Sequence, residues 1–226
     1  MCIRDRFLRA SELEKANVAI GEWQPIQKSA SYILNPIKSQ ADWNILKNFK
    51  LDDDTTWDTD FEGTVVLVDN FVGSGRQMSK LFREAGSPAG GSNAPNLPTF
   101  LAACPKATVK ILIVAGFLGG VKKLRSLAKS LGRVKVYVGH LFDERDRCFS
   151  SESKILPAQQ RDAFQGECRR IARDELGISK TYKYGFGNVQ SLVVLRDDVP
   201  NNTLPIIWKK TDSWRPLFPA DGMLPD

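Results

Sequence analysis

The residues best suited to chemistry lie in one short segment, TVVLVDNFVGSGRQM, which spans residues 64–78. An acid, Asp69, follows an apolar run, and Ser74 stands between two glycines, Gly73 and Gly75. Glycine permits positive φ and close approach of the backbone, so successive N–H groups of this loop can point at an anion, with the Ser74 hydroxyl as a further donor. Asp69 can accept hydrogen bonds from ribose hydroxyls or hold a hydrated Mg²⁺. The order predicts a phosphate-binding loop beside a ribose or metal contact.

Two other classes of phosphate-binding loop lack residues that they require. A Walker A loop needs a lysine after its second glycine, and Arg76 follows Gly75. A dinucleotide-binding loop needs a third glycine where Met78 stands, and an acid near the end of the next strand, where Ala115 and Gly116 stand. The segment is therefore not expected to belong to an ATPase or a dinucleotide-dependent enzyme.

Short apolar runs rich in β-branched residues alternate with helical patterns along the chain. The runs predict buried strands at Thr64–Val68, Val109–Val114, Val134–Val138 and Ser191–Leu195. Helical patterns that each end before a glycine, the residue expected just beyond a helix, span Gln77–Ala85, Gly120–Leu131 and Ala158–Leu176. A shorter helix is predicted at Leu97–Cys104.

This alternation predicts an α/β fold with a mostly parallel sheet, helices on both faces, and ligands beyond the carboxyl ends of the strands. We expect a single domain over residues 7–226. Residues 1–6, MCIRDR, match the translation of a transposase end sequence used in sequencing libraries. We expect them to be an artefact, with the native amino terminus upstream of Phe7. Between Trp208 and Phe218 the chain is aromatic, proline-containing and aperiodic, which predicts an irregular arm packed over the domain surface.

The segment VVLVDNFVGSGRQ resembles the phosphoribosyl-pyrophosphate motif of type I phosphoribosyltransferases, in which a hydrophobic strand ends in two acids before a Thr/Ser-Gly phosphate loop. A closer resemblance is to the phosphoribosyltransferase-like domains of bacterial conflict systems, which occur with anti-phage defence components such as some retrons. It extends from Trp23 to Pro219 and includes HLFDERDRCFSSESKI and YGFGNVQSLVVLRDDVPNNTLPIIWKKTDSWRPLFP. It implies a type I phosphoribosyltransferase-like fold, phosphoribosyl pyrophosphate or a related nucleotide as ligand, Mg²⁺, and defence-system proteins as partners.

The resemblance also implies roles for the residues of the loop. Asp69 matches the first acid and is expected to act in catalysis and to hold Mg²⁺. Asn70 stands where the second acid is usual and is also expected to act in catalysis. Its amide can still hydrogen-bond to ribose but carries no charge, so the change from an acid affects Mg²⁺-assisted catalysis more than ligand binding. The flexible pyrophosphate loop of such enzymes is placed at Lys28–Ser31. The expected ligand-binding residues are Phe71, Val72, Gly73, Ser74, Gly75, Arg76 and Gln77.

Two functions of different classes are consistent with these residues. The first is an enzyme that transfers a ribosyl group or cleaves a nucleotide, mainly by positioning and charge stabilisation. The second is a binding module without turnover, which senses a nucleotide or docks a partner as an effector subunit. Asn70 and the lack of a clear general base favour the second.

Four residues after the third predicted strand have both chemical and structural interpretations. His140 is the only histidine, and Asp143 and Glu144 follow it closely. An acid, base or metal role for these residues is weighed against a solvated charged loop, which we favour. A Cys148 nucleophile paired with His140 is weighed against a cysteine that packs as a small apolar residue, which we also favour.

Glycines and aromatic residues near the expected site leave similar alternatives open. Gly116, Gly119 and Gly120 either line the pocket or form a glycine-rich turn and helix start. Four aromatic side chains in the C-terminal part of the chain could stack on a base or pack within the protein, and packing is favoured for the last three of the set. The set comprises Phe186, Trp208, Trp214 and Phe218.

Composition adds limits to these predictions. The formal net charge is +6, but basic residues are scattered among acids along most of the chain, so we expect nucleic acid to bind weakly if at all. No apolar run is long enough to predict a membrane span. The four cysteines show no close pair typical of zinc or redox sites, which favours free thiols in a reducing cytoplasm.

Overall fold

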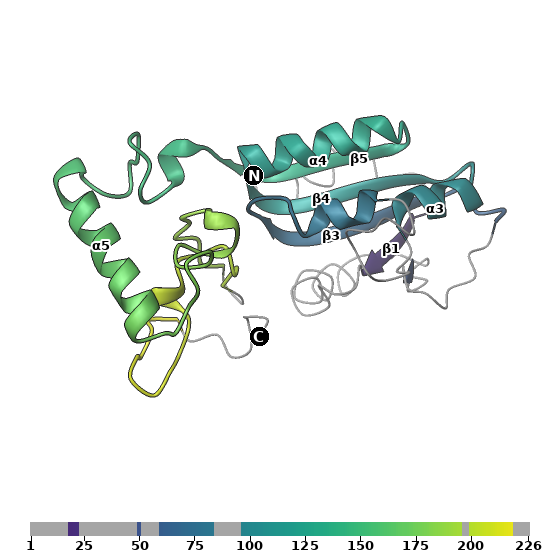
Figure 1. Cartoon of the computed structure of the whole chain (residues 1–226). Helices are drawn as coiled ribbons and strands as arrows, with labels where there is room; N and C mark the ends of the chain where they lie inside the picture. Colours follow the sequence, from purple (N-terminus) through teal and green to yellow (C-terminus); the bar gives the residue numbers. More distant parts are fainter. Residues whose placement is uncertain (1–17, 23–48, 51–58, 84–95, 196–198, 219–226) are drawn as a thin grey trace. The chain divides into compact units, whose positions relative to one another are not determined.

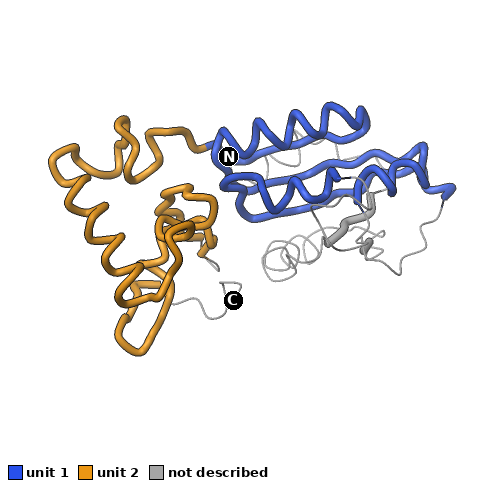
Figure 2. The backbone as a smooth tube through the Cα atoms, in the orientation of Figure 1, with its two compact units in different colours: residues 1–141 blue, residues 142–226 orange. Residues whose placement is uncertain are grey.

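The computed structural model describes residues 18–22, 49–50, 59–83, 96–195 and 199–218. The chain forms two compact units, residues 1–141 and 142–226, which Figure 2 colours separately. The single domain expected over residues 7–226 stays a prediction. The expected artefact at residues 1–6 and the pyrophosphate-loop candidate at Lys28–Ser31 lie outside the described residues.

The first unit is built on a five-stranded sheet (Figure 1). Its strands are β1 (Val18–Glu22), β2 (Phe49–Lys50), β3 (Thr64–Val72), β4 (Thr108–Phe117) and β5 (Val134–Phe142). Their order is β2-β1-β3-β4-β5, and β1 pairs in parallel with β2 and β3, as β3 does with β4. The predicted α/β fold with a mostly parallel sheet is confirmed.

The central strand β3 is longer than the sequence predicted. Its register with β4 runs from Thr64 opposite Thr108 to Val72 opposite Gly116, and the hydroxyls of the two threonines are hydrogen bonded at 2.9 Å. Every residue of β3 is buried, as expected of a strand covered on both faces. The strand ends at Val72, whereas the apolar run predicted an end at Val68.

Short helical elements follow β3 and β4 in the first unit. They are η2 (Met78–Phe82), α3 (Leu97–Ala103) and α4 (Leu118–Ser130). The Asn96 side chain caps α3 by accepting a hydrogen bond from Thr99 N at 2.9 Å. The α-helix predicted from Gln77 is instead a 3₁₀ turn, because Arg83 is extended and ends it. The stop predicted for α4 at Gly132 is confirmed by its left-handed φ of +69°.

One hydrophobic core joins these helices to one face of the sheet. Its members include Val65, Leu67, Leu81, Phe100, Ile111, Ile113 and Leu124. Val66 and Leu112, which strand alternation places on the opposite face, are also buried, at 1% and 7% exposure. Both faces of the sheet are therefore covered.

The second unit is organised around one long helix. Its elements are η3 (Glu144–Asp146), α5 (Ala158–Asp174), η4 (Phe186–Asn188) and η5 (Pro205–Ile207). The core under α5 contains Cys148, Cys168, Ile171, Ala172, Leu176, Ile178, Tyr184, Leu204 and Ile206. In neither unit does a described helix have the length and apolarity needed to cross a membrane.

The strand predicted at Ser191–Leu195 is wrong. The segment makes an isolated parallel bridge between Ser191 and Thr203. Thr203 Oγ1 donates to Val193 O at 2.6 Å, and Val193 N donates to Ser191 Oγ at 3.0 Å. Side chains therefore satisfy backbone groups that a strand would pair in a ladder, which an apolar run alone cannot reveal.

The aromatic tail is irregular, as predicted, but it is more than an arm over the surface. Trp208 is 1% exposed, and its Nε1 donates to Thr203 O at 3.1 Å. Trp214 Nε1 donates to Ile206 O at 2.8 Å, whereas Phe218 remains 46% exposed. The tail supplies core side chains of the second unit because tryptophan buries a large apolar surface once its N–H is satisfied.

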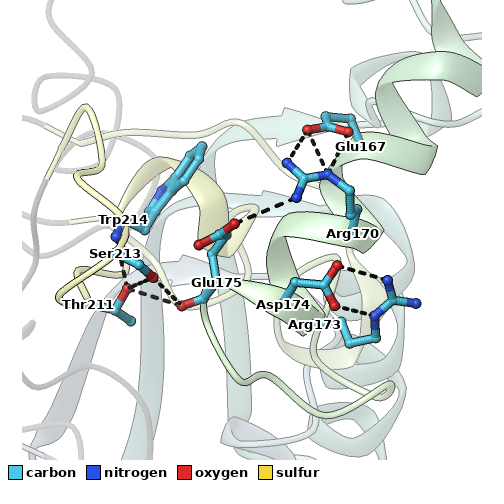
Figure 3. A network of polar contacts seen from close by, with 8 residues as sticks. All are labelled: Glu167, Arg170, Arg173, Asp174, Glu175, Thr211, Ser213 and Trp214. Carbon is cyan, nitrogen blue, oxygen red and sulfur yellow. Dashed lines mark hydrogen bonds and ion pairs between the residues drawn. The ribbon is translucent and has the colours of Figure 1, made fainter.

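The same tail holds the C-terminal end of α5 (Figure 3). Thr211 Oγ1 donates to Glu175 O at 3.1 Å, and Ser213 Oγ donates to the same oxygen at 3.4 Å. The helix stop predicted at Gly177 is confirmed by its left-handed φ of +59°. Side chains from the tail thus satisfy a carbonyl just beyond α5.

Candidate functional site

The predicted phosphate loop lies where β3 ends, beside the end of β4. Val72 pairs with Gly116, and residues 73–77 lead directly into η2, which contacts α4. Gly75 has a φ of +70°, the left-handed conformation for which glycine was expected there, while Gly73 is not left-handed.

The loop packs backbone against backbone on the first turn of α4. A Cβ added at Gly120 would lie 2.3 Å from Gly73 O and 3.0 Å from Gly75 N. A Cβ added at Gly75 would lie 2.9 Å from Gly120 O. Side chains do not fit at such distances, so Gly75 and Gly120 are required by close packing as well as by turn geometry.

The neighbouring glycines have different surroundings. A Cβ added at Gly116 would lie 3.0 Å from Val72 O, so this residue allows the ends of β3 and β4 to approach closely. For Gly119, no described atom lies within 4 Å of an added Cβ. Close packing therefore explains why glycine is needed at positions 116 and 120, whereas Gly119 is exposed at the start of α4.

Hydrogen bonds within the loop hold its shape. Ser79 N donates to Gly75 O at 2.9 Å, and Ser79 Oγ donates to Arg76 O at 2.8 Å. Arg76 N donates to Ser74 Oγ at 3.4 Å. Ser74 is half-buried, and Arg76 and Gln77 are exposed, so this end of the loop is accessible to a ligand.

Asp69 and Asn70 lie inside β3, not at its end. Asp69 pairs in register with Ile113 and is 5% exposed, and Asn70 is 8% exposed. The position expected for Asp69 at the carboxyl end of the strand is therefore wrong. Across the described residues, no group of three or more His, Cys, Asp or Glu side chains is placed to hold a metal.

Phe71 and Val72, which were expected among the ligand-binding residues, have buried side chains. Phe71 packs edge-to-face on Phe117, with ring centroids 6.2 Å apart, and Val72 belongs to the core of the first unit. Both residues position the loop through packing. If Phe71 or Val72 contacts a ligand, we expect the contact to come from its backbone atoms.

The acidic residues after β5 hold a turn. Asp143 accepts a hydrogen bond from Arg145 N at 2.8 Å and pairs with the Arg145 guanidinium at 2.7 Å, while Glu144 pairs with Arg147 at 3.0 Å. Hydrogen bonds from the Arg145 side chain, then from its backbone N–H, lower the pKa of Asp143. Asp146 closes the turn by accepting from Asp143 N at 2.9 Å. These carboxylates are engaged in structural contacts, which favours the structural interpretation over a catalytic one.

Cys148 has the properties of a core residue. Its side chain is fully buried, and burial, followed by the nearby Cys168, raises the pKa of the Cys148 thiol to about 12. The thiol stays protonated at neutral pH and lacks nucleophilic character. His140 is exposed in β5. The thiols of Cys148 and Cys168 are free, as predicted.

The ring of Phe186 already has an aromatic partner. It stacks on Tyr182, with centroids 5.5 Å apart and planes inclined by 20°. Tyr182 itself is 36% exposed. Packing within the protein thus explains Phe186 without a bound base.

The contact between Gly73 and Gly120 was not predicted. The sequence contained a signal, since Gly119 and Gly120 follow an apolar strand and paired glycines mark turns or close backbone approach. That signal does not say which loop approaches. Only the parallel pairing of β3 and β4 brings this loop to α4.

The relation to known proteins rests on a match along nearly the whole chain. A model of the PRTase-CE family, PRTase abbreviating phosphoribosyltransferase, matches residues 6–220. The chain belongs to the PRTase-CE family. The match includes residues of both compact units and the loop at residues 69–77. The phosphoribosyltransferase-like character implied by the sequence is confirmed, while no curated protein matches the chain.

Solved structures are similar to parts of this PRTase-CE chain. A hypoxanthine-guanine-xanthine phosphoribosyltransferase is 14% identical with a TM-score of 0.37, covering 64% of this chain and 73% of that one. Orotate phosphoribosyltransferase from Mycobacterium tuberculosis H37Rv, in complex with inorganic phosphate, is 11% identical with a TM-score of 0.35, covering 62% and 68%. The AQ2163 protein from Aquifex aeolicus is 12% identical with a TM-score of 0.38 and covers 56% of this chain, which spans 55% of that protein.

Proposed function

We propose that this PRTase-CE protein binds phosphoribosyl pyrophosphate or a related nucleotide at residues 69–77. The main support for the proposal is the loop after the parallel strand β3, in which Gly75 has a left-handed backbone conformation and packs against Gly120. A turn of this kind presents backbone N–H groups to an anion. Its shape is held by packing before a ligand arrives, so less conformational entropy is lost on binding.

The accessible side chains of the loop suit a phosphate. The half-buried Ser74 hydroxyl can donate to a phosphate oxygen, and the exposed Arg76 guanidinium adds positive charge with a geometry that matches phosphate. Asp69, the one carboxylate within residues 64–78, is proposed to contact the ribose, with Asn70 as the second catalytic residue.

Mg²⁺ fits this site as an ion carried by the ligand. Asp69 offers one carboxylate, and Mg²⁺ typically takes one or two carboxylates together with substrate phosphates and waters. When bound, the ion would neutralise part of the charge of the pyrophosphate. The chain's own contribution is the ordered loop and the Asp69 carboxylate.

We propose that this binding serves a bacterial anti-phage conflict system in the cytoplasm, supported by the resemblance of three segments of the chain. The alternative is a nucleotide-sensing or partner-binding effector without turnover. Asn70 favours that alternative, and so do Asp143 and Glu144, whose carboxylates are held by arginines rather than placed as general bases. Phage plating on a bacterial host carrying the gene with its genomic neighbours tests the conflict-system role.

Calorimetric titration of phosphoribosyl pyrophosphate with Mg²⁺ tests the site. Gly120→Ala should weaken binding about tenfold or more, because its methyl group displaces the loop carbonyl of Gly73. Gly119→Ala is the matched control and should bind as the wild type does, since open space surrounds that position among the described residues. Unaltered binding in a folded Gly120→Ala protein contradicts the site assignment.

Release of pyrophosphate or free base separates the two functions. Turnover that is present in the wild type and lost in Asp69→Asn establishes the enzyme. Saturable binding without release from any candidate nucleotide establishes the binding module. Thermal unfolding of Asp69→Asn shows whether the buried substitution leaves the fold intact.

A further inference from the structure

The charged residues of the first unit are distributed very unevenly along the sequence. Between Glu84 and Asp143 the chain contains no acidic residue and eight Lys or Arg residues. This stretch includes α3, β4, α4 and β5. The acidic residues that elsewhere lie among the basic ones are absent from this stretch, so its positive charge is not offset within this continuous part of the fold.

Helix α4 gathers four of these cations on its solvent side. Its buried residues are Gly120, Val121, Leu124 and Ala128, of which Leu124 and Ala128 belong to the core that includes residues of β3 and β4. The opposite side exposes Lys122, Lys123, Arg125 and Lys129, together with Ser126 and Ser130. Lys122, Arg125 and Lys129 are spaced at i, i+3 and i+7, so they form a stripe of about 10 Å along the helix.

No acidic partner neutralises this stripe within the described part of the chain. The ion pairs there do not involve Lys122, Lys123, Arg125 or Lys129. Arg133, which follows α4, does not belong to the stripe, because its guanidinium donates hydrogen bonds to carbonyl oxygens of the loop after α3.

The arrangement works against the stability of the helix itself. Lys122 and Arg125, and Arg125 and Lys129, are like charges at spacings that destabilise a helix. Lys129, in the last turn, is favoured by the helix dipole, whereas Lys122, Lys123 and Arg125 lie outside the first and last turns and gain nothing from it. A cationic stripe kept under these conditions is best explained by an external anion.

The surrounding side chains indicate which polyanion fits. A membrane-binding helix places large apolar side chains beside its cations, whereas the described exposed large apolar residues lie outside α4. On α4 the cations are flanked by Ser126, whose exposed hydroxyl can donate to a phosphate oxygen, and by Ser130, whose hydroxyl donates to Leu127 O at 2.7 Å. We propose that the exposed face of α4, defined by Lys122, Lys123, Arg125 and Lys129, binds the phosphate backbone of nucleic acid without reading its sequence.

Fluorescence anisotropy of the full chain with a short labelled DNA, single-stranded and duplex, tests the proposal. The α4 variant carries Lys122→Glu, Arg125→Glu and Lys129→Glu. The control carries Lys180→Glu, Lys210→Glu and Arg215→Glu, three exposed residues of the second unit, and so has the same net charge. At about 50 mM salt the α4 variant should bind about 100-fold more weakly, and its salt slope should be smaller by about three, while the control changes by less than about threefold.

The outcomes separate this surface from the phosphate loop. Retained binding of phosphoribosyl pyrophosphate by the α4 variant is expected, since its substitutions lie on the solvent face of α4. Equal losses in both variants, or no DNA binding by the wild type at low salt, overturn the proposal. Binding to anionic phospholipid vesicles that exceeds binding to DNA overturns it in favour of a membrane. If the glutamates unfold the chain, the glutamine variant Lys122→Gln, Arg125→Gln, Lys129→Gln must show the same loss in smaller measure.

Discussion

Helices α4 and α5 use their positive charges in opposite ways. On α5, Arg170 pairs with Glu167 at 2.6 Å and with Glu175 at 3.6 Å, and Arg173 pairs with Asp174 (Figure 3). These contacts hold the pKa of Arg170 above its usual value. The four cations of α4 have no such carboxylate among the described residues. The charges of Arg170 and Arg173 on α5 are compensated by carboxylates within the protein, whereas those of α4 are the ones proposed to bind an external polyanion.

On their buried sides the two helices are alike, and this similarity predicts the largest effects. Leu124 of α4 is fully buried, and Ile171 of α5 is 6% exposed. Leu124→Ala and Ile171→Ala should each lower the free energy of unfolding by about 2–5 kcal/mol through lost burial and a residual cavity. Chemical denaturation measures both. A loss well under 1 kcal/mol at either position contradicts the packing of that helix.

The junction between α4 and the phosphate loop predicts the next effect. Gly75 and Gly132 have nearly the same φ, +70° and +69°, but only Gly75 has close neighbours among the described atoms. Gly132→Ala should lower stability by about 1 kcal/mol through backbone strain alone, and Gly75→Ala by about 3 kcal/mol through strain plus overlap with Gly120. If urea denaturation shows equal losses of stability for Gly75→Ala and Gly132→Ala, the loop is not in close contact with α4.

The thiols under α5 predict a dependence of stability on alkaline pH. Burial raises the pKa values of Cys148 and Cys168 to about 12 in the folded state, so only the unfolded chain ionises them as pH rises above about 8.5. The unfolded state then binds fewer protons, and stability should fall by about 1.4 kcal/mol for each thiol at pH 9.5. Melting temperatures across this range measure the slope. The Cys148→Ala, Cys168→Ala double variant should be less stable at neutral pH, but the decrease in its stability between about pH 8.5 and 9.5 that comes from thiol ionisation should disappear.

The smallest expected effect compares the exposed cations directly. Arg170→Gln removes an ion-paired guanidinium and should lower the melting temperature slightly. Arg125→Gln removes a cation that lies between like charges and should leave the melting temperature unchanged or raise it. Both shifts should shrink at high salt. A loss in Arg125→Gln as large as that in Arg170→Gln would show that α4 has a compensating partner within the protein.

Local patterns predicted the elements that depend on local chemistry. The short helix predicted at Leu97–Cys104 is present as α3, and Gly132 and Gly177 take the left-handed conformation just beyond α4 and α5. These features need only neighbouring residues. The strand predicted at Ser191–Leu195 failed because a strand requires a partner alongside it, and Thr203 instead offers its side chain to Val193.

Taken alone, the sequence determined the α/β class and a glycine turn after a buried strand, because apolar β-branched runs and a Gly-Ser-Gly segment are local signals. Its resemblance to phosphoribosyltransferase-like domains indicated the family. The tertiary structure decided three further points. It extended β3 past Asp69, brought Gly120 against Gly73, and turned the cations of α4 away from the core. Each depends on the pairing of β3 with β4 and on packing against the sheet, which bring together residues more than forty positions apart in the sequence.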